Sequence, residues 1–219
     1  IAAAKKDSID KTVTVIDSLY REDQFYLGIS YNILRNRPPN VSQNSFSVGL
    51  ALGFLRDMPL NKKRNVAIAA GLGYSLSDYR QNIKITEAGG AASYEVVDES
   101  KVDFDKNKFA LHYLDLPIEF RWRTSTVQSH QFWRIYTGFK LSYLFLNKSK
   151  YVDGDEKIRI FGNGDFNKLQ YGAYISLGYN TWNLQAYYGL NTLLKSDAKI
   201  AGKSIDMNAL NIGLIFYIL

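Results

Sequence analysis

The sequence predicts an all-β protein, an eight-stranded antiparallel up-and-down transmembrane β-barrel. Three observations predict this class. Bulky apolar residues alternate with small or polar ones along eight segments, the links between these segments alternate in length, and charges inside the segments keep to one parity. Alternate side chains of a strand point to opposite faces, so each segment has one bulky face and one small or polar face. A membrane barrel turns the bulky face to lipid.

The alternation is clear in the segment 45–55, where Leu50, Leu52 and Phe54 alternate with Ala51 and Gly53. A tilted strand crosses a bilayer with about 9–11 residues, so each segment is long enough to span. An even strand number keeps both termini on one side of the membrane. The eight predicted strands are 24–35, 45–55, 65–80, 109–123, 132–146, 166–179, 182–192 and 208–219.

The links between the predicted strands alternate from the second onward. Short links at 56–64, 124–131 and 180–181 alternate with long links. Outer-membrane barrels have short periplasmic turns and longer external loops. We therefore expect the short links and both termini in the periplasm, with residues 1–22 as an N-terminal periplasmic extension and 23–219 as the barrel. The long links, expected outside, are 36–44, 81–108, 147–165 and 193–207.

Composition fits this class and excludes several others. There is no cysteine for disulfide or thiol chemistry, and aromatic residues make up 14% of the chain. The sequence contains no run of about 18 apolar residues, so no transmembrane helix is predicted. A net charge of +6 without a basic stripe interleaved with aromatics gives no sign of nucleic-acid binding. No motif points to a cofactor, a metal or a small-molecule substrate, and we expect none.

Charged residues of the fourth and fifth predicted strands all have the inward parity. We expect them to form an ionic network that seals the lumen, with Arg134 and Lys140 reaching Asp115 and Glu119 from the neighbouring strand. Pro117 cannot donate to the ladder, so a bulge or a local opening is expected there. The predicted lumen network consists of Asp115, Glu119, Arg121, Arg123, Arg134 and Lys140.

Enzymatic chemistry is not expected. His112 has the lipid-facing parity and His130 falls in a short turn, so neither is placed to activate a lumenal nucleophile. Asp115 and Glu119 lie about 13 Å apart along one strand by its rise per residue, too far for a carboxylate pair that hydrolyses glycosides.

A soluble ligand-binding barrel is the main alternative fold. It would reverse every face and pack the largest residues of eight strands into an interior wide enough for side chains or one small ligand. Such an interior would be overpacked. The membrane orientation is therefore the one we expect.

The first short turn is longer and more basic than a hairpin needs, which makes it a candidate surface for a periplasmic partner. The alternative is a solvated turn. The candidate docking residues are Arg56, Asp57, Met58, Pro59, Asn61, Lys62, Lys63 and Arg64.

Two stretches resemble known families. The run Tyr113–Arg121, with its Tyr-Leu-acid-aliphatic-Pro pattern, resembles the outer-membrane β-barrel family widespread in Bacteroidetes. The stretches Arg21–Asn32 and Gly53–Asn65 are similar to the PorT (SprT) family of the type IX secretion system. This resemblance, over most of 20–219, implies an integral outer-membrane protein that supports protein export and gliding in an accessory or assembly role. It implies other secretion-system proteins and membrane lipid as partners. A generic structural or adhesive barrel acting through its external loops is the alternative.

Overall fold

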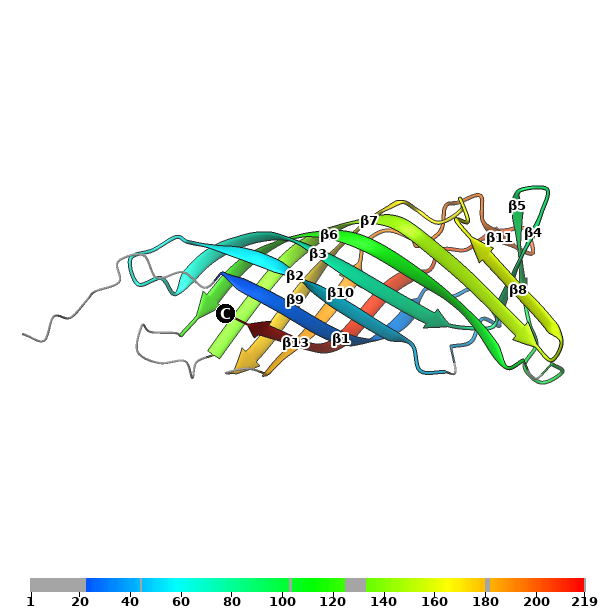
Figure 1. The fold of residues 1–219 in the computed structure, drawn as a ribbon, viewed down its shortest axis with the longest axis horizontal. Helices are drawn as coiled ribbons and strands as arrows, with labels where there is room; N and C mark the ends of the chain where they lie inside the picture. Colours follow the sequence, from blue (N-terminus) through cyan, green and yellow to red (C-terminus); the bar gives the residue numbers. More distant parts are fainter. Residues whose placement is uncertain (1–22, 44, 103, 125–132, 180–181, 219) are drawn as a thin grey trace, which may run out of the picture.

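The computed structural model describes residues 23–43, 45–102, 104–124, 133–179 and 182–218. Eight of the strands pair antiparallel, each with the next, and the first pairs with the last, so that the sheet closes (Figure 1). The predicted eight-stranded barrel is confirmed. Its strands are β1 (Gln24–Arg35), β2 (Val48–Pro59), β3 (Val66–Arg80), β6 (Lys106–Arg123), β7 (Trp133–Asp153), β9 (Leu169–Tyr179), β10 (Trp182–Gly189) and β13 (Asn208–Ile218). Among the described residues, no helix is long and apolar enough to cross a membrane.

The bulky face of every barrel strand points outward. Leu72 is 70% exposed and Phe25 61% exposed, whereas Ala67, Ala69 and Ser176 on the other parity are buried in the lumen. Soluble monomers rarely expose a continuous apolar belt of this kind. The expected orientation, with the large side chains toward lipid, therefore holds, and the soluble alternative is wrong.

The two ends of the barrel differ. One end, which we call the turn rim, carries the start of β1, the end of β13 and the link Leu60–Asn65 between β2 and β3. The other end, the loop rim, carries the long links and three hairpins that extend to the right in Figure 1. The hairpins are β4 (Ile83–Ala88) with β5 (Ala91–Val96), β8 (Glu156–Phe161) on the extended end of β7, and β11 (Lys199–Ile200) with β12 (Lys203–Ser204).

The sequence does not predict these hairpins, because its composition there is that of polar links. Gly89 and Gly90 join β4 to β5, and both have positive φ, 60° and 81°. A two-residue link with positive φ at both positions matches the right-handed twist of paired strands. The expected loops 81–108 and 147–165 are thus partly folded as sheet.

Pro117 produces a local opening rather than a bulge. The pairing of β3 with β6 keeps one register from Ala70–Ile118 to Gly73–Asp115, while the positions of Leu116 and Pro117 between them are unpaired with β3. The register shift of β6 lies instead at His112 and Tyr113, on its β7 side. The bulge turns both Phe145 and Leu146 outward, 49% and 40% exposed.

Candidate functional site

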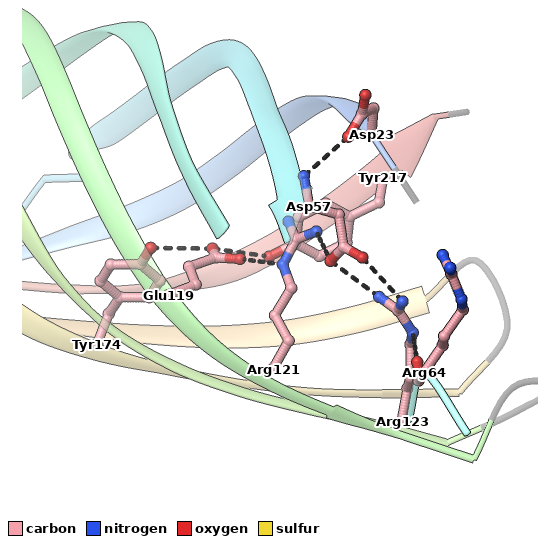
Figure 2. A network of polar contacts seen from close by, with 8 residues as sticks. All are labelled: Asp23, Asp57, Arg64, Glu119, Arg121, Arg123, Tyr174 and Tyr217. Carbon is pink, nitrogen blue, oxygen red and sulfur yellow. Dashed lines mark hydrogen bonds and ion pairs between the residues drawn. The ribbon is translucent and has the colours of Figure 1, made fainter. Parts of the chain in front are cut away.

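Four charged side chains form a compact cluster inside the lumen near the turn rim, which we call the charged cluster. It consists of Asp57, Glu119, Arg121 and Arg123, all at most 2% exposed (Figure 2). Two carboxylates and two guanidinium groups balance formally to zero. Buried charges are tolerated where they are paired and hydrogen-bonded, which this arrangement provides.

Asp57 is the centre of the cluster. Its carboxylate accepts hydrogen bonds from both guanidinium groups of the cluster, at 3.1 Å from Arg121 Nη1 and at 3.0 and 2.8 Å from Arg123. Its backbone amide donates to the Asp23 carboxylate at 2.8 Å. Charge-assisted, forked pairs of this kind fix geometry as well as charge. They link β2 to β6 across the inside of the wall.

Glu119 carries the cluster toward the middle of the lumen. It accepts from Arg121 Nε at 2.8 Å, from the Tyr174 hydroxyl at 2.9 Å and from the Tyr217 hydroxyl at 3.4 Å. The Arg121 guanidinium also lies over the Tyr136 ring, 4.8 Å from its centroid. Strands β6, β7, β9 and β13 therefore meet through one carboxylate, one guanidinium and three tyrosines.

The prediction for Asp57 is wrong. The charged, proline-containing composition of residues 56–64 predicts a turn with Asp57 as a docking residue. In the structure β2 continues to Pro59, and the side chain of Asp57 is fully buried. The signal is present in the sequence: Leu55 and Asp57 keep the inward parity, with Phe54, Arg56 and Met58 on the outward one. Charge and proline content obscure this alternation.

The six residues predicted as one network fall into separate groups. Lys140 pairs with Asp115 at 3.3 Å, as expected, and its ammonium lies over the Tyr187 ring, 4.6 Å from the centroid. Glu119, Arg121 and Arg123 join Asp57 instead. Arg134 is buried and lies opposite Arg123 in the β6–β7 register, not across from Asp115 or Glu119.

Two cavities of about 40 Å³ each lie along the middle of the lumen. One is lined by Asp115, Glu119, Tyr26 and Tyr174, the other by Ser30, Ser75 and Asn211. A buried water needs about 10–15 Å³ of cavity volume, so each cavity holds a few waters at most. Neither cavity has room for a peptide segment.

An apolar plug fills the lumen toward the loop rim. Phe109 contacts both Tyr79 and Phe166, with ring centroids 5.2 and 5.3 Å apart. Links and hairpins supply much of the plug, including Ile83, Leu194 and Met207, each 2% exposed or less. The lumen is therefore closed by an apolar plug at one end and by the charged cluster at the other.

The rest of the candidate docking surface lies on or beside the turn rim. Lys62 and Lys63 are exposed, and Met58 is 45% and Leu60 57% exposed. The link itself is ordered: the Leu60 amide donates to the Val66 carbonyl at 2.8 Å, and the Arg64 carbonyl accepts from Arg123 Nε at 3.1 Å. Through Arg123, the base of the turn is coupled to the charged cluster.

Among the described residues, the one histidine is His112, and it points away from the lumen. His112 lies on the outer face, where its Nδ1 is 2.7 Å from the Tyr74 hydroxyl. His130, the extension 1–22 and the turn 124–131 except Thr124 lie outside the described residues.

A closed barrel with a lipid-facing apolar belt defines the class of integral β-barrel membrane proteins. The family model of the outer membrane protein beta-barrel domain matches residues 7–195, and the chain belongs to this family. A search of curated proteins found no match to it. As a member of that family, the chain is an outer-membrane β-barrel.

Proposed function

We propose that this barrel is a non-enzymatic component of the type IX secretion system, with an accessory or assembly role in protein export and gliding. The similarity of Arg21–Asn32 and Gly53–Asn65 to the PorT (SprT) family supports the system. The observation that carries the accessory role is the lumen, which is filled by the charged cluster, the tyrosines around it and the apolar plug.

A filled lumen does not suit a conduit. Cavities of about 40 Å³ cannot admit even an extended peptide. Opening the turn-rim end would require breaking the buried ion pairs of the charged cluster. Breaking each pair would leave a charge without a partner in a low-dielectric interior. Cargo therefore passes elsewhere, and this protein acts through its surfaces.

The surface that we assign to a secretion-system partner is the turn Leu60–Arg64, which we place in the periplasm. It presents two exposed lysines beside an exposed leucine on an ordered backbone. Interfaces commonly combine an apolar centre with a charged rim. An acidic or mixed surface on a periplasmic partner fits this combination.

The turn can be tested with side chains that do not hold the barrel together. We expect Leu60→Ser/Lys62→Ser/Lys63→Ser to leave the barrel folded and inserted, because these side chains are exposed. Export of several cargo proteins should fall about tenfold or more, the effect of losing about 1.4 kcal/mol of binding. Cargo in the culture medium is the measurement, at equal barrel levels in the membrane.

The matched control changes the same residue types at the loop rim: Leu190→Ser/Lys199→Ser/Lys203→Ser, all exposed. It should export normally. If the turn variant exports as well as wild type, the turn is not the docking surface. If only the control fails, a barrel that acts through its loops is the better description.

Conductance tests the filled lumen. Purified protein in planar bilayers should show no stable, large channel, because both ends of the lumen are occupied by packed side chains. Insertion should be verified on the same sample by heat-modifiable migration in gels. A reproducible porin-sized current from folded wild-type protein would contradict the accessory role.

The alternative function, a structural or adhesive barrel acting through external loops, has one observation in its favour. A polar cavity of about 480 Å³ lies among the loop-rim links, lined by Asn40, Ser42, Asn82 and the stretch Val96–Ser100. Deletion of the gene separates the two functions. Loss of several unrelated cargo proteins from the medium supports the secretion role, whereas intact export with reduced adhesion supports the alternative.

A further inference from the structure

Four cations stand side by side in one row on the outer wall of the barrel near the loop rim. Arg80 of β3 is paired with Lys108 of β6, Lys108 with Lys150 of β7, and Lys150 with Arg159 of β8. Directly opposed residues of antiparallel strands have Cβ atoms about 4.5–5.5 Å apart. We call Arg80, Lys108, Lys150 and Arg159 the cation row.

The side chains of the cation row point away from the lumen. Their neighbours on each strand, Tyr79, Phe109, Tyr151 and Ile160, are the ones buried inside. Three further lysines, Lys106, Lys148 and Lys157, share the outward parity on β6, β7 and β8. The row is therefore the centre of a larger basic surface on one side of the barrel.

Positive charge dominates this surface even though one carboxylate is present. Asp78 of β3 forms an ion pair with Lys108. The charges of Lys106, Arg159, Lys148 and Lys108 all act on the Lys150 ammonium. Like charges directly opposed on a sheet destabilise it. The repulsion among the four cations of the row therefore destabilises the fold, and a bound anion would reduce that repulsion.

The depth of the cation row in the membrane indicates which anion it meets. Tyr74, His112 and Phe145 form an aromatic group on the same outer face, with ring centroids 6.1 to 6.2 Å apart. His112 is paired with Leu76, the last apolar outward residue of β3, so the lipid-facing belt ends beside this group. Lys108 lies four residues beyond His112, about 13 Å along a tilted strand. That is the level of lipid headgroups, where long Lys and Arg side chains also snorkel.

The row also faces sideways. Three members lie on barrel strands, and Arg159 lies on β8, which extends β7 at the loop rim. All four side chains point away from the lumen, so an anion that contacts all four lies beside the barrel and not over its mouth. Phe161, 59% exposed, lies next to it with the Lys148 ammonium 4.8 Å from its ring centroid, which offers an apolar contact close to the charges. An amphiphile with more than one negative group on a rigid head fits this surface.

We propose that the cation row binds the phosphate groups of the outer-leaflet glycolipid, the lipid A part of lipopolysaccharide. Long Lys and Arg side chains whose Cβ atoms lie about 5 Å apart can bring their charged groups to the same phosphate, and arginine binds phosphate with two parallel hydrogen bonds. The proposal takes from the proposed function only that the loop rim faces outward; it does not depend on a role in secretion.

The test is binding of purified barrel in a neutral detergent to bis-phosphorylated lipid A, measured by native mass spectrometry. Lys150→Gln/Arg159→Gln removes two members of the row. The matched control, Lys199→Gln/Lys203→Gln, removes two exposed cations of the same rim from the β11–β12 hairpin. We expect wild type and control to bind alike, and the row variant to bind at least about tenfold more weakly.

Thermal stability supplies a second readout, in which the reversal by lipid A is the effect that simple loss of a surface charge would not produce. In neutral detergent without lipid A, the row variant should unfold at a higher temperature than wild type, because repulsion within the row is relieved. With lipid A present the order should reverse. Heat-modifiable gel migration over a temperature series measures both states and shows that each variant is folded.

Three outcomes would overturn the proposal. Equal lipid A affinity of the row variant and the control would show that the row is not the site. If inorganic phosphate stabilised the wild-type barrel as much as lipid A does, the ligand of the row would be a free anion and not a lipid. Tighter binding of phosphatidylglycerol than of lipid A would place the row at the inner leaflet, and the orientation of the barrel would then be the reverse of the one proposed. The secretion role would still be tested separately, by the cargo assay.

Discussion

Leu72→Arg is expected to abolish stable membrane insertion. Leu72 is 70% exposed and lies near the middle of the apolar outward stretch of β3, which runs from Val66 to Leu76. An arginine facing lipid at mid-depth costs about 2–4 kcal/mol, a large part of the stability of a small barrel. Folding into lipid vesicles, followed by heat-modifiable migration and urea unfolding, measures the loss.

The matched control is Leu60→Arg, the same change at a residue that is 57% exposed but lies on the turn rim. A cation near the interface costs about 0–1 kcal/mol, so this variant should fold almost as well as wild type. Leu50→Arg, on the lipid face of β2, is expected to behave like Leu72→Arg. A folded, detergent-free monomer of Leu72→Arg would refute the membrane orientation.

Asp57→Asn is expected to destabilise the barrel by about 3–5 kcal/mol, because it leaves the buried guanidinium groups of Arg121 and Arg123 without their shared carboxylate. Urea unfolding in vesicles, followed by tryptophan fluorescence, gives the free energy. Asp115→Asn should cost less, because its partner Lys140 is 20% exposed and can turn to water. Asp98→Asn, on the surface, should have no measurable effect.

Replacing the whole charged cluster tests whether its role is stability or specificity. The variant Asp57→Leu/Glu119→Leu/Arg121→Met/Arg123→Met removes every member together, so no charge is left alone. It should be less destabilised than Asp57→Asn, as buried ion pairs often exchange for apolar residues at little cost. If the fourfold variant is the worse of the two, the ion pairs stabilise the barrel beyond what apolar packing provides.

Much of the barrel is predictable because its signals are local. The period-two alternation of Leu50, Leu52 and Phe54 against Ala51 and Gly53 needs no knowledge of neighbouring strands, and it assigns lumen and lipid faces correctly. Link lengths then order the strands into an up-and-down meander. The charges from Asp115 to Arg123 of β6 follow the inward parity, so the alternation alone is enough to place Glu119, Arg121 and Arg123 inside the lumen.

The errors come where a local signal has two meanings. Arg56, Asp57 and Pro59 look like a turn by composition, but β2 pairs with β3 as far as Pro59–Ala67 and carries Asp57 into the lumen. The loop-rim hairpins escape prediction for a similar reason. Their polar outer faces resemble links, and their apolar inner residues are explained only by the plug on which they pack.

By itself, the sequence determined the class of this protein: eight strands, closed antiparallel, with a lipid face and a lumen face. Side-chain parity along a strand is a property of the backbone alone. Only the tertiary structure decided which charges meet, because register is a relation between strands that are distant in the chain. Register brings Asp57 of β2 to Arg121 and Arg123 of β6, and it aligns Arg80, Lys108, Lys150 and Arg159 in one row.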